Sequence, residues 1–208
     1  MTEPMLEAAS TLEEVREVLG DCKRCPLHVA RGKLVFGYGD PAADLMFVGE
    51  GPGRAEDAQG LPFVGPAGKV LDEMLAGIGM DRSQVYIANV VKCRPPGNRD
   101  PLPLEIETCN PFLAAQIRII RPRIVCELGR IAAGVMMGWP LQMTKVHGTR
   151  VDGPGYFNVP VFHPAAALRT PSTMELLRQD FTNLRSYLDE TDEPPRPPEP
   201  EPEQLGLF

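Results

Sequence analysis

The chain has 208 residues, of which 43% are hydrophobic and 24% are charged, a size typical of one domain or of one domain with a tail. Its 28 acidic and 21 basic residues give a formal net charge of −7, and an acidic total argues against a nucleic-acid partner because such proteins are usually basic. No apolar run is long enough to span a bilayer. The N-terminal residues lack the basic and apolar regions of a signal peptide, so we expect a soluble, cytoplasmic monomer.

The charge is distributed unevenly along the chain. Residues 191–208 contain six prolines, five acidic residues and one arginine, a composition that cannot bury a core. We therefore predict one folded domain over residues 1–190 and a disordered tail over residues 191–208. Residues 82–130 carry eight Lys or Arg residues against four Asp or Glu residues. This local excess fits either a solvated helix face or a patch that faces phosphate groups.

Hydrophobic periodicity predicts helices and strands that alternate along the chain. We expect, in chain order, a helix over 5–19, a strand over 44–49, a helix over 67–78, a strand over 85–91, a helix over 103–120, a strand over 124–128, a helix over 130–137, a strand over 159–162 and a helix over 174–188. This alternation predicts an α/β fold with a parallel sheet covered by helices on both faces.

Three polar residues lie at or near the ends of predicted strands. Glu50 follows the first strand, Asn89 lies toward the end of the second, and His163 follows the fourth. Ligands of such sheets bind beyond the carboxyl ends of the strands. We therefore expect these three side chains to converge on one pocket.

Four of the five cysteines suggest a shared site. Cys22 and Cys25 form a C-x-x-C pair, Cys93 follows the second strand, and Cys109 comes 16 positions later. In a reducing compartment four thiolates fit either a structural zinc ion or an iron–sulfur cluster. A thioredoxin-like redox pair fits less well, because the C-x-x-C precedes any βαβ unit. Cys126 lies within an apolar strand and is expected to be a small buried residue.

Several motifs agree with one known family. They are GEGPG at 49–53, GLPFVGPAGKVLDEML at 60–75, NVVKCRPPGNRDPLP at 89–103 and HPAAALR at 163–169. Together with the order of the cysteines, this set resembles family 4 uracil-DNA glycosylases. The resemblance implies a three-layer α/β/α fold with a central four-stranded parallel sheet, and excision of uracil from single- or double-stranded DNA in base excision repair. It also implies a 4Fe–4S cluster held by Cys22, Cys25, Cys93 and Cys109.

The resemblance also assigns roles in the uracil site. Phe63 would stack on the base after it has left the DNA stack, and Asn89 would pair with the O4 and N3–H edge of uracil through its amide. His163 would donate to O2 as negative charge develops. Glu50 would place the water or stabilise the sugar cation, and the carbonyl group of Gly51 could help to position the water.

The resemblance extends to specificity and to DNA contacts. Glu56 would crowd the C5 edge of uracil and so exclude the methyl group of thymine. Leu168 is the expected wedge that fills the vacated stack, and Arg169 is expected to meet a phosphate. The loop after the second strand would aim its cations at the DNA backbone, namely Lys92, Arg94 and Arg99.

Two other functions on such a scaffold are a non-catalytic module that binds uracil-DNA and a zinc-stabilised DNA-binding protein. The joint presence of Glu50, Asn89 and His163 favours the enzyme. Family X relatives trap the sugar covalently through a His in a basic insert, and the segment GNRDPLPLEIE contains neither the insert nor a His. We therefore expect a monofunctional glycosylase with ordinary turnover.

The last five residues, QLGLF, resemble the pentapeptide that binds the bacterial sliding clamp. Gln204 would bond at the rim of the pocket, while Leu205, Leu207 and Phe208 would fill apolar subsites. These residues follow a polar stretch without hydrophobic residues. We expect a weak tether to replication or repair machinery.

Overall fold

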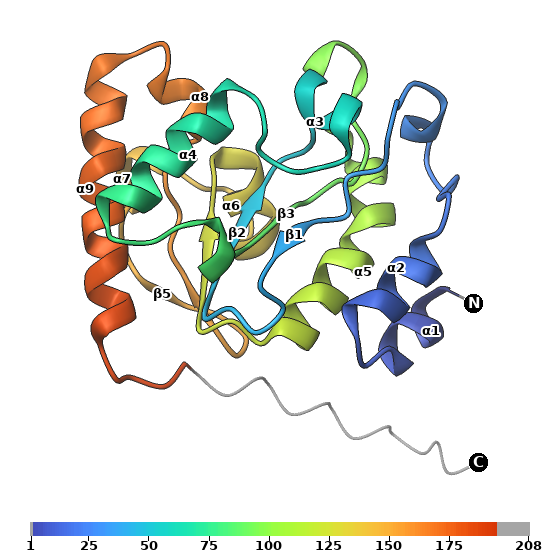
Figure 1. The fold of residues 1–208 in the computed structure, drawn as a ribbon, viewed down its shortest axis with the longest axis horizontal. Coiled ribbons are helices and arrows are strands. Elements are labelled where there is room, and N and C mark those ends of the chain that lie inside the picture. The colour runs from blue at the N-terminus through green and yellow to red at the C-terminus, as the bar shows by residue number, and fades with distance from the viewer. Residues whose placement is uncertain (1, 195–208) are drawn as a thin grey trace.

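The computed structural model describes residues 2–194 (Figure 1). The predictions for the greater part of the tail, including the clamp-binding peptide at Gln204–Phe208, concern residues outside this range. Within it, none of the helices combines the length and the apolar character needed to cross a membrane.

A six-stranded sheet forms the centre of the fold, in the order β1-β3-β2-β4-β6-β5. Its strands are β1 (Tyr38–Gly39), β2 (Leu45–Gly49), β3 (Tyr86–Asn89), β4 (Ile124–Glu127), β5 (Val151–Asp152) and β6 (Phe157–Asn158). The four inner strands are parallel, and the two-residue edge strands β1 and β5 pair antiparallel to their neighbours. The prediction of a four-stranded parallel sheet is therefore confirmed, with two short edges added.

Helices cover both faces of the sheet, as Figure 1 shows. The α-helices are α1 (Thr2–Ala8), α2 (Leu12–Leu19), α3 (Arg54–Gln59), α4 (Pro66–Gly77), α5 (Pro103–Ile120), α6 (Arg130–Met137), α7 (Met143–Val146), α8 (Pro164–Ala167) and α9 (Pro171–Asp189). Short 3₁₀ turns occur at Pro26–Val29, Arg82–Gln84 and Pro96–Asn98.

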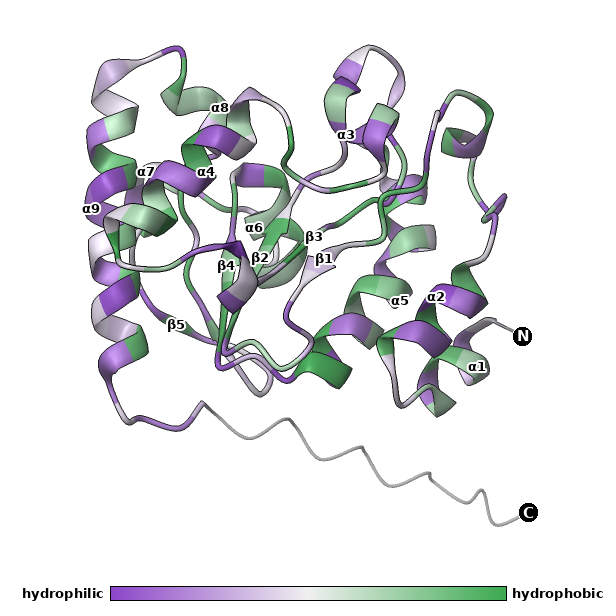
Figure 2. Ribbon diagram, in the orientation of Figure 1, coloured by the Kyte–Doolittle hydropathy of each residue, from purple (hydrophilic) through white to green (hydrophobic). Residues whose placement is uncertain are grey.

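The two faces of β2 show how the alternation of side chains builds two cores. Phe47 points toward α4 and α9, where it stacks on Phe181 with ring centroids 5.8 Å apart. Val48 points the other way and shares a cluster with Leu113 of α5 and Ala132 of α6. Because both faces of the inner strands are buried, these strands are continuous apolar runs, visible in green at the centre of Figure 2.

The prediction of one continuous helix over 5–19 is wrong. The structure has α1 and α2 instead, because Thr11 caps α2 by accepting a hydrogen bond from the backbone of Glu14, whose carboxylate bonds back to the Thr11 amide. The predicted strand over 159–162 begins earlier in the structure, because β6 covers Phe157–Asn158, while Val159 and Val161 continue its backbone hydrogen bonds to the β4 segment.

Candidate active site

The carboxyl ends of β2 and β3 bring two of the predicted site elements together. Gly49 pairs with Asn89 in the register of the two strands. A Cβ atom on Gly49 would lie 2.8 Å from the Phe63 ring and would also overlap the Asn89 amide. The ring and the amide therefore meet over a glycine, and a side chain there would occupy the space between them.

Phe63 is held in an unusual backbone conformation. Its φ of 52° lies in the left-handed region, which costs free energy for a residue with a Cβ atom. Arg82 fixes this loop by donating to the carbonyl groups of Pro62 and Gly68, at 3.2 and 3.3 Å, and to that of Phe63 itself. Sequence reasoning missed Arg82, because nothing in its local pattern distinguishes it from a surface cation.

Asn89 has a buried side chain without a partner. The residue is 1% exposed, and neither its amide nitrogen nor its amide oxygen has a hydrogen-bond partner within the described residues. An unpaired buried amide costs about 1–3 kcal/mol. Orphaned groups of this kind in a native fold indicate a role other than stability, such as ligand binding.

His163 lies beside Phe63, with ring centroids 5.8 Å apart. Its Nδ1 accepts a hydrogen bond of 3.1 Å from the Ala165 amide and caps α8, so in this arrangement the neutral ring carries its proton on Nε2. Burial lowers the pKa of His163 to about 4, with Glu56 opposing the shift. Gly129 has a φ of 92°, and a Cβ atom there would lie 2.9 Å from the Cβ of His163.

Glu50 is the acidic residue at the end of β2. Burial raises its pKa, the nearby Asp100 carboxylate raises it further, and Arg130 opposes both effects. Arg130 donates to Asp100 at 2.9 Å, so the two neighbours largely neutralise each other. Gly51 follows directly, packed so that a Cβ atom would lie 2.8 Å from a methyl group of Val91.

Glu56 has a clear structural contact in addition to its predicted role. One of its carboxylate oxygens accepts hydrogen bonds from the amides of Val64 and Gly65, at 3.0 and 2.9 Å. Glu56 therefore anchors the loop that carries Phe63. Its predicted role at the C5 edge of uracil stays a prediction.

The predicted phosphate contact of Lys92 is wrong. The side chain is 1% exposed, and its ammonium group donates to the Asn89 carbonyl at 2.8 Å and to Oε1 of Gln116 at 2.6 Å. Its net effect is to hold the backbone of Asn89. Arg99 is bound to both carboxylate oxygens of Glu105, at 2.8 and 2.7 Å, which leaves less of its charge for DNA.

The remaining predicted DNA contacts are accessible. Leu168 follows α8 and is 51% exposed. Arg169 is also exposed, and Arg94 is partly exposed with its Nε bonded to Asn98 at 2.6 Å. An exposed apolar side chain of this size five residues after His163 is compatible with the predicted wedge.

The four predicted ligand cysteines line one small cavity, together with Arg31, Lys92 and apolar side chains. Arg31 donates to Sγ of Cys93 at 3.4 Å, and the Lys92 amide donates to Sγ of Cys109 at 3.3 Å. Within residues 2–194, no three His, Cys, Asp or Glu side chains stand ready to hold a single metal ion. The donor set is nevertheless that of a four-thiolate site, with two cations beside it to offset negative charge. Cys126 is fully buried in β4, as predicted.

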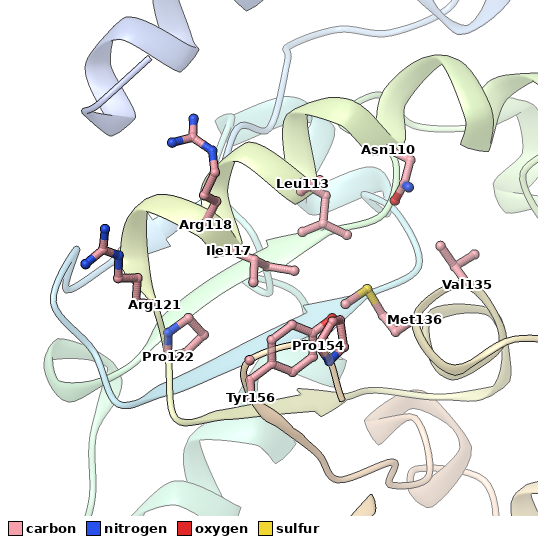
Figure 3. Close-up of a pocket in the computed structure, with 12 residues that line it drawn as sticks. Asn110, Leu113, Ile117, Arg118, Arg121, Pro122, Val135, Met136, Pro154 and Tyr156 are labelled. Atoms are coloured by element: carbon pink, nitrogen blue, oxygen red, sulfur yellow. The ribbon is translucent and has the colours of Figure 1, made fainter. Parts of the chain in front are cut away.

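A larger groove of about 760 Å³ lies elsewhere, between α5, α6 and the β5–β6 turn (Figure 3). Leu113, Ile117, Met136 and Tyr156 form much of its wall, and Arg121 lies at its edge. No residue predicted for the uracil site lines it. Because Arg121 precedes β4, the groove reaches the amino ends of the strands, away from the site at their carboxyl ends.

Comparisons with known proteins show the family of this chain. The profile described as "Uracil DNA glycosylase superfamily" matches residues 36–188. Type-4 uracil-DNA glycosylases are similar along most of their length: that of Archaeoglobus fulgidus is 44% identical over 82% of this chain and 89% of its own, and that of Thermotoga maritima is 42% identical over 86% and 97%.

The fold is shared more widely. The structure of Pedobacter heparinus SMUG2 aligns with a TM-score of 0.50 at 13% identity, covering 71% of this chain and 77% of that one. At this identity the likeness concerns the fold alone. From the family profile and the close relatives together, the chain belongs to the uracil-DNA glycosylase superfamily, in its type-4 branch.

Proposed function

We propose that this protein excises uracil from DNA by hydrolysing the bond between N1 of the base and the deoxyribose, leaving an abasic site. The observation that carries the proposal is the buried amide of Asn89, which lies beside the Phe63 ring and has no hydrogen-bond partner among residues 2–194. An amide presents one donor and one acceptor side, which complement O4 and N3–H of uracil. Cytosine presents the reverse pattern, so an amide held in one orientation rejects it.

The base reaches this site only after leaving the DNA stack, at a cost of a few kcal/mol. Phe63 offsets part of that cost by stacking on the flipped base. Its loop is fixed from two sides, by Arg82 and by the Glu56 carboxylate, so the ring is in place before the base arrives. A preorganised ring loses little entropy on binding.

His163 stabilises the leaving base. As the bond breaks, negative charge spreads onto O2 of uracil, and a donor already aimed at that atom lowers the barrier. Because the Ala165 amide occupies Nδ1 and the pKa is lowered to about 4, His163 is neutral at physiological pH and presents Nε2–H. It is therefore an electrophilic donor rather than a general acid that gives up its proton.

Glu50 and Gly51 face the sugar side of the reaction. A carboxylate there stabilises a cation-like deoxyribose and orients the attacking water, with the Gly51 carbonyl as a second acceptor. Although its pKa is raised, proximity to a developing cation favours its ionised form. Outside the base pocket, Leu168 fills the vacated position in a duplex, while Arg94 and Arg169 contact phosphates.

We propose that Cys22, Cys25, Cys93 and Cys109 hold a 4Fe–4S cluster, which supplies structural cross-linking. The support is that all four line one cavity with N–H and cationic neighbours. Iron and sulfide analysis, with a broad visible absorbance, tests the assignment. A colourless protein that contains zinc instead would contradict it.

We further propose a cytoplasmic location, because thiolate ligands persist in a reducing compartment, and a weak interaction of Gln204–Phe208 with the sliding clamp. Calorimetric titration of the clamp with the full chain and with its Leu207→Ala, Phe208→Ala variant tests the second point. Equal heats of binding for both chains would contradict an interaction of Gln204–Phe208 with the clamp.

The glycosylase proposal is tested by single-turnover cleavage of single- and double-stranded oligonucleotides that contain one uracil. We expect free uracil and an alkali-labile abasic site, without a denaturant-resistant protein–DNA adduct. No release of uracil by the wild-type protein would overturn the function. Full activity of His163→Ala would overturn only the role of that residue.

A further inference from the structure

His147 lies behind the candidate active site and has none of the roles described above. Its ring packs against Phe162, with ring centroids 4.6 Å apart, and Phe162 directly precedes His163 in the chain. Its Nδ1 lies 2.8 and 3.1 Å from the two carboxylate oxygens of Asp180. Asp180 belongs to α9, so His147 links this long helix to the residue before His163.

Asp180 depends on this partner. The residue is 2% exposed, and a buried carboxylate is costly unless it is paired or hydrogen-bonded. Burial raises the pKa of Asp180 while His147 opposes that shift. Since a carboxylate accepts and the short contact involves Nδ1, that nitrogen carries a proton, and the Asp180 carboxylate fixes the plane of the ring that touches Phe162.

The same segment is held by α9 through a second set of bonds. Asn183 and Tyr187 each donate to the Gly148 carbonyl at 3.2 Å, and the Gly148 amide donates to Pro160 at 2.8 Å. These bonds fix the main chain after His147. They provide a natural control, because they act on the backbone while the His147 ring acts on Phe162.

We propose that His147 and Asp180 are positioning residues for the glycosylase reaction: their pair fixes Phe162 and thereby aims the Nε2–H of His163 at the uracil O2. The inference rests on the proposed function of His163. The His163 ring is already bonded to the Ala165 amide, so it moves with the local backbone and not by free rotation. Displacement by about 1 Å from the reacting group can cost on the order of 100-fold in rate, which makes a remote support effective.

The test compares full-length His147→Gln, Asp180→Asn and Tyr187→Phe in single-turnover uracil release from a single-stranded oligonucleotide. Gln keeps a donor for Asp180 but removes the ring, and Asn keeps an acceptor for His147. Tyr187→Phe removes one bond to Gly148 and keeps its own ring. We expect His147→Gln to slow release about tenfold with unchanged oligonucleotide affinity, Asp180→Asn to fall between it and wild type, and Tyr187→Phe to retain the full rate.

A readout independent of catalysis separates this inference from the glycosylase proposal. The ring resonances of His163 in NMR spectra should shift in His147→Gln and stay in place in Tyr187→Phe, whether or not the wild type releases uracil. Unmoved His163 resonances in His147→Gln would overturn the positioning role. The positioning role would also be overturned if His147→Gln and Tyr187→Phe lost the same fraction of the rate and this loss were proportional to their loss of thermal stability.

Discussion

Replacement of Asn89 by Leu should separate stability from function. The side chain is 1% exposed and both polar atoms of its amide are unpartnered within the described residues. Leu has a similar size and shape without the amide. Removing an unsatisfied buried amide increases the free energy of unfolding by about 1–3 kcal/mol. At roughly 2–4 °C per kcal/mol for a domain of this size, we expect Asn89→Leu to melt several degrees above the wild type.

The same change should abolish most of the activity. Two hydrogen bonds to a base that becomes anionic are worth about 1.5–3 kcal/mol each, and each 1.36 kcal/mol is tenfold in rate. We therefore expect single-turnover uracil release to fall at least about 100-fold. The measurements are thermal melting followed by circular dichroism at one fixed scan rate, and release of labelled uracil under single-turnover conditions.

Asn158 offers a matched control. It is also a buried strand asparagine, 3% exposed, and its amide oxygen is unpartnered within residues 2–194, but it lies in β6 away from the uracil site. Asn158→Leu should leave uracil release unchanged. A lower melting temperature for Asn89→Leu, with activity lost in proportion to unfolding, would refute the reasoning, because Asn89 would then be a structural residue.

Three further predictions concern single residues. The pKa of His163 is lowered to about 4 in the folded chain from an ordinary 6.5, so between these pH values the unfolded state binds more protons and the protein loses stability as the pH falls from 6.5 to 4. His163→Gln should therefore flatten this part of a plot of melting temperature against pH, and an unchanged slope would contradict the pKa shift. Arg82→Lys replaces a guanidinium that serves three carbonyl groups and should slow uracil release about tenfold with a stability loss of about 1–2 kcal/mol, measured by the same two assays. Leu168→Ala should lower cleavage of duplex substrates and spare single strands, in paired assays, because only a duplex has a vacated stack to fill.

The sequence predicted the site better than it predicted the periphery. Asn89 and His163 follow from one rule, that ligands bind at the carboxyl ends of parallel strands, and the structure places both beside Phe63. By contrast, α3 buries no residue at all, so it has no apolar stripe from which to predict it. The edge strands β1 and β5 have two residues each, too few for a periodic signal.

Lys92 marks a different limit. The sequence pattern, a lysine in a loop next to cysteines, predicts a phosphate contact, whereas the buried ammonium group binds Gln116, 24 residues away, and the Asn89 carbonyl. Such a partner is set by tertiary packing and has no local signature. His163 shows how one residue can serve both the fold and the proposed chemistry: it caps α8 through Nδ1, and this same bond leaves the Nε2–H group for the proposed contact with the base.

The placement of the basic residues predicts how DNA binding responds to salt. Of the eight Lys and Arg residues within 82–130, most are bonded to other groups of the protein: Arg118 donates to the carbonyl groups of Leu6 and Ala9, and Arg123 donates to those of Tyr187 and Leu188. Lys92, Arg82, Arg99 and Arg130 have the partners described above.

The apparent basic patch is therefore largely paired within the protein, and Arg94 and Arg169 remain as the predicted phosphate contacts. Neutralising Z phosphates on duplex DNA gives a slope of about −0.9Z when the logarithm of affinity is plotted against that of salt concentration. Eight free cations would give about −7, whereas two or three give about −2 to −3. Fluorescence anisotropy with a labelled duplex across a salt series measures this slope, and Arg94→Gln should reduce its magnitude by about one. A slope near −7 would refute the assignment of these cations to partners within the protein, because counterion release counts only the cations that reach the DNA. An acidic chain with few free cations must then gain most of its specificity from contacts with the flipped base. Asn89 and Phe63 are the residues that we propose make these contacts.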